Sequence, residues 1–407
     1  MKYLDFVELN YKPKETDLTC TFSVEPEGIS LNEAAGGVAA ESSVGTWTEL
    51  TTELPYVKQL AAHVYSIQGN TIKIAYPIEL FEPANMPNIL SSIAGNVFGL
   101  KTLKNLRLLD IHLPKALITS FKGPTYGIEG IRKLLNVPKR PLVGTIIKPK
   151  LGLKTKDHAK VAYEAWLGGC DVVKDDENLS SQAFNPFEER LVQTLEGRDK
   201  AQSETGERKV YMINITAETQ TMLKRAQVVV DQGGEYVMVD ILTCGWSALQ
   251  TLRNQNLKLV LHAHRAGHAA FTKNPLHGIA MKPIATVARI IGVDQLHVGT
   301  VVGKMSETKE EVLENIEACK AELDGLKPVL PVASGGLHPG LVPALLETFG
   351  ADVVLQAGGG IHGHPDGTVA GAKAMRQAVD ATLEGKTLGE HAKSHRELAL
   401  AIEQWKG

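Results

Sequence analysis

Residues 158–177 read HAKVAYEAWLGGCDVVKDDE, a helical stretch that runs through two glycines into a short apolar strand and ends in charged residues. A strand that follows a helix in this way is typical of parallel sheets, because parallel strands are joined by long crossovers that are usually helical. This strand ends in Lys174, followed by Asp175, Asp176 and Glu177. Adjacent carboxylates repel one another. The stretch therefore raises two questions: whether the unit repeats, and what the acids are for.

The unit repeats through the rest of the chain. Eight apolar strand candidates follow one another: PLVGTIIK (141–148), CDVVK (170–174), VYMINIT (210–216), EYVMVDIL (235–242), LKLVLHAH (257–264), DQLHVGT (294–300), PVLPVAS (328–334) and ADVVLQAG (351–358). Helical stretches lie between most of them, for example KEEVLENIEACKAEL (309–323). Eight strand–helix units predict a (β/α)₈ TIM barrel over residues 123–407. A doubly wound open sheet is the alternative, but it more often has a Rossmann glycine fingerprint after its first strand, and none stands there.

The first 122 residues follow a different pattern. TCTFSVEP (19–26) and NTIKIAYPIELF (70–81) alternate like strands, whereas 31–43 and 85–99 read as helical. We therefore predict a smaller ferredoxin-like α+β domain over residues 1–122. Glycine and proline in FKGPTYGIEG (121–130) are typical of a boundary with the barrel domain.

The composition is that of an ordinary globular protein. Of the 407 residues, 43% are hydrophobic and 22% charged, and the formal net charge is −3 without a basic block. This balance argues against nucleic acid as a partner and leaves small molecules as the expected ones. Scattered cysteines (Cys20, Cys170, Cys244 and Cys319) predict free thiols in the cytoplasm and no zinc site. Because the N-terminus lacks an apolar signal core and no uninterrupted apolar run reaches about 18 residues, we expect neither secretion nor a membrane span.

Nearly every predicted barrel strand ends in polar residues or glycines. In strand order they are Lys148 and Lys150; Lys174 to Glu177; Asn214; Asp240; His262, His264 and Arg265; His297; Ser334 to Gly336; and Gly358 to Gly360. Taken alone, each has an ordinary structural explanation, such as a surface ion pair, a buried histidine or a tight turn. In a TIM barrel, however, the carboxyl ends of the strands meet at one rim, where the chemistry takes place. The whole set therefore predicts an active site at that rim.

The residue types indicate the chemistry of this site. Alternation along a strand places Lys148 and Lys150 on one face. It likewise places Lys174 and Asp176 on one face, with Asp175 pointing away. Clustered carboxylate oxygens suit a hard cation such as Mg²⁺, and the glycine-rich loops after the last two strands can hold phosphates through backbone N–H groups. The residues alone thus predict a Mg²⁺-dependent enzyme acting on a phosphorylated, oxygen-rich substrate.

Several motifs are more specific. They are KPKLGL (148–153), GGCDVVKDDENLSSQ (168–182), HAHRAGHAAFTKNPLHGI (262–279), DQLHVGTVVGKM (294–305), PVASGGLHPG (331–340), LQAGGGIHGHPDG (355–367) and, in the first domain, AAESSVGTWTEL (39–50) and SIAGNVFGLK (92–101). Together they resemble the large subunit of ribulose-bisphosphate carboxylase (RuBisCO), most of all its archaeal form III branch. The resemblance implies a carboxy-lyase that adds CO₂ to the magnesium-bound enediolate of ribulose 1,5-bisphosphate, giving two molecules of 3-phosphoglycerate, with O₂ as a competing substrate.

The resemblance also implies catalytic and metal-binding residues. Lys174 matches the lysine that takes up an activating CO₂ as a carbamate, which together with Asp176 and Glu177 would hold Mg²⁺. Lys148 and Lys150 match lysines that handle proton transfer and polarisation around the reacting carbons.

Further matches surround the substrate. His264 matches a histidine near the substrate hydroxyls, and Lys304 matches a flexible-loop lysine that orients the incoming CO₂. The matches at the phosphates and the rest of the substrate are Arg265, His297, Ser334, Gly335, Gly336, Gly358 and Gly359. The matches in the first domain, which the family supplies from the neighbouring subunit, are Glu41, Thr46, Trp47 and Asn96. The resemblance therefore implies a homodimer with shared active sites, with or without a higher assembly of dimers.

The chain departs from the family pattern around the flexible loop. Ser306-Glu307 follows the loop motif where Glu-Gly is usual, and the segment 305–333 is shortened, which bears on loop closure and the preference for CO₂ over O₂. Ile146 and Gly267 also replace the usual threonine and methionine. Two alternatives follow: a RuBisCO-like enolase or isomerase acting on another ketose phosphate, and a non-catalytic phosphoester-binding protein. Retention of the lysines and of the metal-ligand residues together favours the carboxylase over both.

Overall fold

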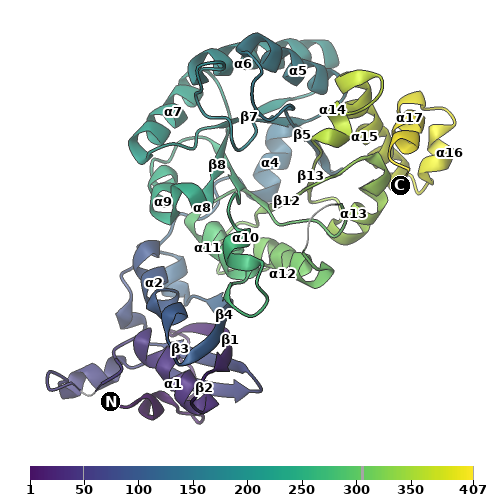
Figure 1. The fold of residues 1–407 in the computed structure, drawn as a ribbon. Coiled ribbons are helices and arrows are strands. Elements are labelled where there is room, and N and C mark those ends of the chain that lie inside the picture. Colours follow the sequence, from purple (N-terminus) through teal and green to yellow (C-terminus); the bar gives the residue numbers. More distant parts are fainter. Residues whose placement is uncertain (49, 304–306, 407) are drawn as a thin grey trace. The chain divides into compact units, whose positions relative to one another are not determined.

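The structure is a computed structural model that describes residues 1–48, 50–303 and 307–406 (Figure 1). Contacts within the chain define two compact units. Unit 1 comprises Met1–Lys122, Gly267–Ile291 and Leu323–Gly325, and unit 2 comprises Gly123–Ala266, Gly292–Glu322 and Leu326–Gly407. Within the described ranges, no helix is long and apolar enough to cross a bilayer.

Unit 1 is built on a five-stranded sheet with the order β10-β4-β1-β3-β2. Its strands are β1 (Leu18–Pro26), β2 (His63–Gln68), β3 (Thr71–Tyr76), β4 (Leu103–His112) and β10 (Gly278–Ile279). Its helices are η1 (Tyr3–Phe6), α1 (Leu31–Glu41), η2 (Pro55–Leu60), η3 (Ile78–Leu80), α2 (Met86–Ile93), η4 (Asn96–Gly99), α3 (Lys115–Ile118), α10 (Ala269–Thr272) and α11 (Met281–Ile291). The order β1-α1-β2-β3-α2-β4, with antiparallel pairing of β1 to both β3 and β4, confirms the predicted ferredoxin-like fold.

Local sequence explains where these elements begin and end. Alternate residues of β1 are buried, as its alternating sequence predicts. α1 starts at a capping box, in which the Glu33 N–H donates to Ser30 Oγ at 3.2 Å and the Ser30 N–H donates to Glu33 Oε2 at 2.9 Å. The helix predicted over 85–99 is interrupted, because the backbone at Gly95 leaves the helical region with a ψ of −114°.

Unit 2 contains a closed barrel of parallel strands in the order β11-β12-β13-β5-β6-β7-β8-β9. The strands are β5 (Leu142–Ile146), β6 (Val172–Lys174), β7 (Val210–Asn214), β8 (Tyr236–Asp240), β9 (Val260–His264), β11 (Gln295–His297), β12 (Leu330–Ser334) and β13 (Val354–Gln356). Each lies inside one of the eight predicted apolar segments, which confirms the TIM barrel.

The remaining helices belong to unit 2. They are α4 (Gly127–Leu135), α5 (Thr155–Leu167), α6 (Phe187–Thr205), α7 (Thr219–Asp231), α8 (Ile241–Cys244), α9 (Trp246–Asn254), α12 (Lys309–Lys320), η5 (Pro339–Leu341), α13 (Val342–Phe349), α14 (Gly359–His362), α15 (Gly367–Leu383), α16 (Leu388–Ala392) and α17 (Arg396–Gln404). α5 and α12 coincide closely with the helices predicted there from the sequence.

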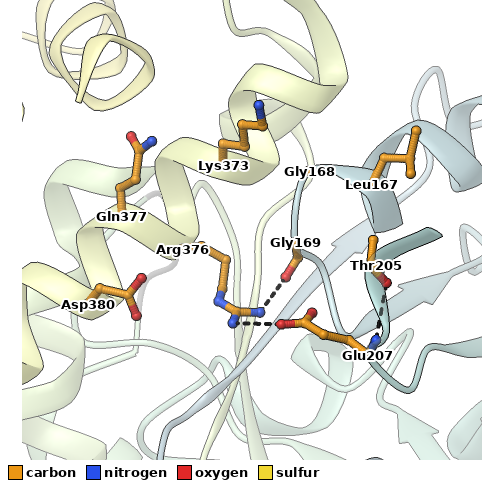
Figure 2. A pocket seen from close by; sticks show the side chains of 9 residues that line it. All are labelled: Leu167, Gly168, Gly169, Thr205, Glu207, Lys373, Arg376, Gln377 and Asp380. Carbon is orange, nitrogen blue, oxygen red and sulfur yellow. Dashed lines mark hydrogen bonds and ion pairs between the residues drawn. The ribbon is translucent and has the colours of Figure 1, made fainter. Parts of the chain in front are cut away.

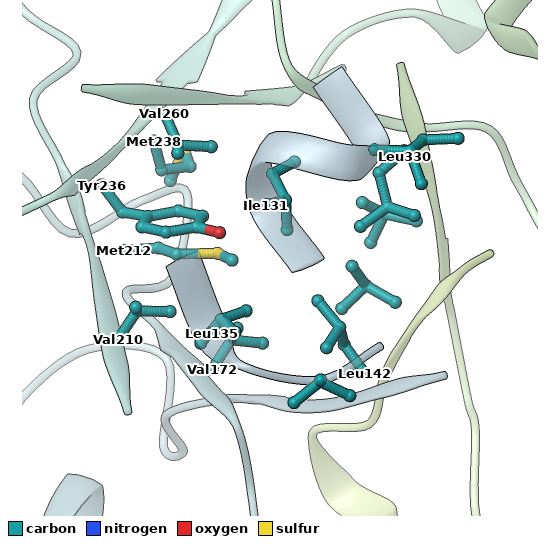
Figure 3. Packing of buried hydrophobic residues seen from close by; sticks show 14 residues of the cluster. Ile131, Leu135, Leu142, Val172, Val210, Met212, Tyr236, Met238, Val260 and Leu330 are labelled. Carbon is teal, nitrogen blue, oxygen red and sulfur yellow. The ribbon is translucent and has the colours of Figure 1, made fainter. Parts of the chain in front are cut away.

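An apolar core fills the amino-terminal end of the barrel. Ile128, Ile131 and Leu135 of α4 pack among the first residues of the strands, so that α4 plugs this end (Figure 3). Val172 of β6 belongs to this core. Because side chains two residues apart share a strand face, Lys174 also points into the barrel, beyond the apolar layer. The core thus ends where the charged residues at the carboxyl ends of the strands begin.

Candidate active site

Strand β6 leads directly into the run of acids noted in the sequence. Its last residue, Lys174, is fully buried. Asp175 turns the opposite way and accepts a hydrogen bond of 2.5 Å from the Tyr211 hydroxyl. Asp176 turns back and accepts a hydrogen bond of 2.7 Å from Lys148 Nζ. The side chains therefore alternate as the sequence predicts, with Lys174 and Asp176 on one side and Asp175 on the other.

The Lys174 amine lies in an environment that lowers its pKa and so makes its charged form less favourable than in water. Its Nζ donates to the backbone oxygen of Asp175 at 2.7 Å and lies 3.8 Å from Glu177 Oε2. Burial lowers the pKa of Lys174, and the nearby charges of Glu177 and Asp240 offset this effect only in part. A neutral amine has a free lone pair and is a nucleophile. Lys174 is thus suited to react with a small electrophile.

Lys148 and Asp176 form the second pair of the cluster. Burial opposes ionisation of Asp176, but hydrogen bonds from Lys148 and Asn178 outweigh it and lower the pKa of this carboxyl. β5 ends at Ile146, so Lys148 lies beyond the strand and the predicted sharing of one strand face with Lys150 is wrong. Lys150 is exposed and, among the residues that the structure describes, has no hydrogen-bond or ion-pair partner.

His264 faces the same cluster, and its ring is fixed by a contact on the side away from the acids. Its Nδ1 is 2.7 Å from Asp240 Oδ1, and its Nε2 is 3.8 Å from Glu177 Oε2. Since a carboxylate can only accept, Nδ1 carries the proton and Nε2 is turned toward the acids. Burial raises the pKa of Glu177, but the charges of Lys174 and His264 outweigh it, so the net shift is downward. Asp240 was named among the strand-end residues of the rim, but no role in the site was predicted for it.

A pair of buried histidines lies next to this group. His262 Nδ1 is 2.7 Å from Gln295 Oε1, and His262 Nε2 is 2.9 Å from His297 Nε2. If the amide oxygen accepts from His262 Nδ1–H, then His297 Nε2–H donates to His262, and both rings are neutral. Burial lowers the pKa of His262 to about 3 and that of His297 well below its ordinary value. The sequence predicted His297 for the substrate site and named His262 among the strand-end residues of the rim, whereas Gln295, which orients His262, was not singled out.

Arg265 has one half of its guanidinium engaged and one half not. Its Nη2 lies 2.5 Å from Glu307 Oε1, whereas its buried Nη1 has no hydrogen-bond partner among the described residues. Burial lowers the pKa of Arg265, and the charge of Glu307 opposes this shift. An unpartnered buried donor next to a neutral histidine fits an anionic group of a ligand. Lys304, the predicted loop lysine, lies outside the described residues.

The loops after β12 and β13 hold the predicted phosphate-site residues Ser334, Gly335, Gly336, Gly358 and Gly359. A Cβ on Gly358 would lie 3.0 Å from Lys148 Cε, so only glycine lets this loop lie so close to the lysine. A Cβ on Gly303 would lie 2.3 Å from the Gly335 oxygen, so the loop after β11 packs closely on the loop after β12. The glycine loops thus adjoin the lysine–carboxylate cluster.

The predicted site residues of the first domain all lie in unit 1. They are Glu41 at the end of α1, Thr46 and Trp47 just after it, and Asn96 at the start of η4. Glu41 Oε1 accepts a hydrogen bond of 3.4 Å from the Tyr3 hydroxyl. Trp47 is 82% exposed, which leaves a large aromatic surface available to a partner.

A shallow polar pocket lies at the other end of the barrel, where α5 and α6 end and α15 passes (Figure 2). Its volume is about 280 Å³. Arg376 Nη1 donates to the Gly169 oxygen at 2.9 Å, and Nη2 lies 3.2 Å from Glu207 Oε1. Because its arginine is already satisfied by protein groups, this pocket is a weaker candidate than the rim at the carboxyl ends of the strands.

Comparison with protein families matches almost the whole chain. Residues 127–405 match the family described as "Ribulose bisphosphate carboxylase large chain, catalytic domain". Residues 5–117 match the corresponding N-terminal domain. The chain belongs to the RuBisCO large-chain family.

Archaeal members of this family are similar over the full length. The ribulose bisphosphate carboxylase of Methanocaldococcus jannaschii is 50% identical, over 99% of this chain and 100% of its own. The ribulose bisphosphate carboxylase of Pyrococcus abyssi is 51% identical, over 99% of this chain and 96% of its own. The solved octameric RuBisCO of Pyrococcus horikoshii, described as a sulfate ion complex, superposes with a TM-score of 0.97 at 50% identity, over 100% of this chain and 98% of that chain. The dimeric RuBisCO of Hyperthermus butylicus gives 0.92 at 45% identity, over 99% of each chain.

Proposed function

We propose that this protein is a RuBisCO of the archaeal form III type, which carboxylates ribulose 1,5-bisphosphate to two molecules of 3-phosphoglycerate and accepts O₂ in competition with CO₂. The observation that carries the proposal is the buried Lys174, whose amine has a lowered pKa although it lies beside carboxylates. An ordinary ion pair would raise that pKa. Full-length relatives named ribulose bisphosphate carboxylase, about half identical to this chain, support the same reaction.

Activation begins at Lys174 Nζ. The neutral amine attacks the carbon of CO₂: a C–N bond forms, one C=O π bond breaks with its electron pair moving to oxygen, and the nitrogen passes one proton to water, so that the lysine becomes an anionic carbamate. Within the described residues no three His, Cys, Asp or Glu side chains lie close enough to hold a metal ion. With a carbamate added, Lys174, Asp176 and Glu177 make an oxygen-rich ligand set of the kind that Mg²⁺ prefers. Mg²⁺ bound there supplies a Lewis acid that stabilises negative charge developing on substrate oxygens.

Lys148 and His264 would handle protons at the rim. The Lys148 ammonium is held by Asp176 at 2.7 Å and can donate a proton from Nζ to a substrate carbon or oxygen. His264 keeps its Nδ1 proton on Asp240, which leaves Nε2 to accept a proton from a substrate hydroxyl. Lys150, which is exposed, is proposed to act only when substrate covers it.

The two phosphates would bind at two places on the rim. Arg265 Nη1, buried without a described partner, and the neutral His297 would bind one phosphate. The glycine loops, with Ser334, Gly335, Gly336, Gly358 and Gly359, would bind the other through backbone N–H groups. Holding both ends pins the carbon chain between them, beside Lys148 and Asp176. Lys304 is proposed to close over the incoming CO₂.

We further propose a homodimer as the smallest active unit. Glu41, Thr46, Trp47 and Asn96 would complete the site of the neighbouring subunit, which fits the exposure of Trp47. The similar archaeal enzymes are described as dimeric and octameric, so both a dimer and an assembly of dimers are compatible with this proposal.

Product analysis tests the reaction. The protein is preincubated with bicarbonate and Mg²⁺, and ribulose 1,5-bisphosphate and labelled CO₂ are added. We expect acid-stable label in 3-phosphoglycerate. Absence of label, with solvent deuterium entering a different ketose phosphate, would instead identify a RuBisCO-like enolase or isomerase. Absence of both would identify a phosphoester-binding protein.

A further inference from the structure

Asp175, the middle acid of the run, has no part in the reaction proposed above. We infer that Asp175 is a positioning residue, which fixes the end of β6 so that Lys174 and Asp176 on either side of it face the metal site. This inference rests on the proposed function, because it concerns how the ligand set of that function is held.

Both oxygens of Asp175 are bound by protein groups, and the side chain is fully buried. Oδ1 lies 2.5 Å from the hydroxyl of Tyr211 and 3.1 Å from Nε2 of His158, and Oδ2 lies 3.1 Å from Nε of Arg190 and 3.0 Å from the backbone N of Asn214. A carboxylate offers about four acceptor positions, so this side chain cannot rotate without losing partners. Asp175 therefore ties β6 to β7 and α6.

The groups that bind Asp175 also fix the chain that follows it. Asn214 Nδ2 donates to the backbone oxygen of Glu177 at 3.0 Å. Arg190 donates to two backbone oxygens of the next loop, to Ser180 at 2.6 Å and to Asn185 at 2.8 Å. The network thus holds the backbone around all three proposed ligands from the side opposite to the Lys174 and Asp176 side chains.

Asp175 touches the reactive amine as well. Its backbone oxygen accepts the hydrogen bond from Lys174 Nζ at 2.7 Å. A change in the backbone at this position would therefore move the amine and the Asp176 carboxylate together. Groups that hold metal ligands in place are commonly worth about 10- to 100-fold in metal affinity. Loss of the Asp175 carboxylate is expected to fall within that range.

The same strand provides a matched control. Asp171, which precedes β6, is buried like Asp175 and is also bound by an arginine, with Arg140 Nη1 2.6 Å from Oδ2 and Nη2 2.6 Å from Oδ1. It lies at the opposite end of the strand from Lys174. Asp175→Asn and Asp171→Asn are similar chemical changes. Each replaces a carboxylate oxygen that accepts hydrogen bonds with an amide NH₂ group that can only donate. Only the first lies next to the ligand set in the chain, between Lys174 and Asp176.

The experiment titrates Mg²⁺ into each full-length protein in saturating bicarbonate and follows binding by calorimetry. We expect the Mg²⁺ dissociation constant of Asp175→Asn to rise about 10-fold or more, and that of Asp171→Asn to stay within about 2-fold of the wild type. Equal affinities in all three proteins, or equal losses in both variants, would overturn the inference. If the wild type itself binds no Mg²⁺ under these conditions, the proposed function fails first, so the two failures are distinguishable.

A second pair of variants covers the case in which Asp175→Asn does not fold. Tyr211→Phe removes the hydroxyl that donates a hydrogen bond to Asp175 Oδ1. Tyr236→Phe removes a buried hydroxyl that has no hydrogen-bond partner among the described residues. We expect Tyr211→Phe alone to weaken Mg²⁺ binding, by less than Asp175→Asn. Equal Mg²⁺ affinity in the two phenylalanine variants would contradict the positioning role.

Discussion

The two ends of strand β6 carry similar buried charges but use them differently. At the amino end, Asp171 accepts two hydrogen bonds of 2.6 Å from Arg140 and one of 2.8 Å from the Val143 N–H. At the carboxyl end, Lys174 Nζ has one backbone acceptor and lies 3.8 Å from Glu177 Oε2. The first group has a full set of short hydrogen bonds, whereas the second has one hydrogen bond and one longer contact with a carboxylate.

The difference separates charge that stabilises the fold from charge that waits for a ligand. A buried charge is costly unless it is paired and hydrogen-bonded, so an incompletely paired one needs another reason to be there. Around the carboxyl end, the pKa of Lys174 is lowered and Arg265 Nη1 lacks a described partner. We expect CO₂ to bind at Lys174 and a phosphate to bind at Arg265.

The largest effect is expected from replacing two buried lysines, one near each end of β6, with methionine. Lys174→Met should lower carboxylation by at least about 10³-fold, because the proposed carbamate cannot form, with unfolding free energy equal or higher. Lys209, equally buried just before the neighbouring strand β7, is 2.7 Å from Glu207 Oε2 and donates to the oxygen of Cys170, which precedes β6. Lys209→Met should retain activity and lose stability. Labelled-CO₂ assays measure the activity of each variant, and urea unfolding measures its stability. Loss of activity in Lys209→Met and loss of stability in Lys174→Met would contradict the comparison.

The next effect concerns the acids. Asp171→Asn should lower the unfolding free energy by about 3 kcal/mol, because Arg140 is left without its buried partner, while kcat stays near the wild-type value. Asp176→Asn should abolish most activity with a smaller change in stability, since its partner Lys148 is partly exposed. Urea denaturation, with kinetics measured on the same samples, distinguishes the two variants. Equal losses of stability in Asp171→Asn and Asp176→Asn would contradict the proposed difference between the two ends of β6.

The histidine pair sharpens the comparison through pH. His262 ordinarily titrates at 6.5, but burial lowers its pKa in the fold to about 3. The unfolded chain therefore binds a proton that the fold excludes, and stability that is present above about pH 6.5 is lost as the pH falls toward 3. His262→Gln should flatten this part of the curve, whereas His112→Gln, at an exposed position, should not. Unfolding measured across this range is the check, and identical slopes would be contrary to the account.

The smallest effect is expected at Arg265. Its ion pair with Glu307 holds a carboxylate close to the proposed phosphate site, where it repels an anion. Glu307→Gln should lower the KM for ribulose 1,5-bisphosphate by about 5-fold, equivalent to about 1 kcal/mol, with kcat little changed. Glu310→Gln, an exposed position on α12, is the matched control. A rise in KM for Glu307→Gln alone would show that the glutamate assists binding instead.

Local patterns were sufficient to predict the barrel, because continuous apolar segments between helices leave few alternatives. They were insufficient where tertiary contacts decide. α4 acquires its role as the plug of the barrel only from its neighbours, and β10 joins unit 1 from residues 278–279, far along the chain. Alternation failed at Lys148 because β5 stops at Ile146.

The candidate site shows the same division. Residue types at the strand ends predicted the cluster of Lys174, Asp176 and Lys148. The contacts that Asp240, His262 and Glu307 make could not be predicted, because each joins segments distant in sequence. The domain boundary at 122–123 and the cytoplasmic location stay predictions, as does the role of Lys304.

The central claim is that Lys174, the buried lysine at the end of β6, becomes an anionic ligand. Carbon-13 NMR of the wild type and of Lys174→Met, each with labelled bicarbonate and Mg²⁺, tests it directly. We predict a carbamate resonance in the wild type that is missing from the variant. A resonance that persists in Lys174→Met, or none in a wild type that carboxylates ribulose 1,5-bisphosphate, would contradict the claim.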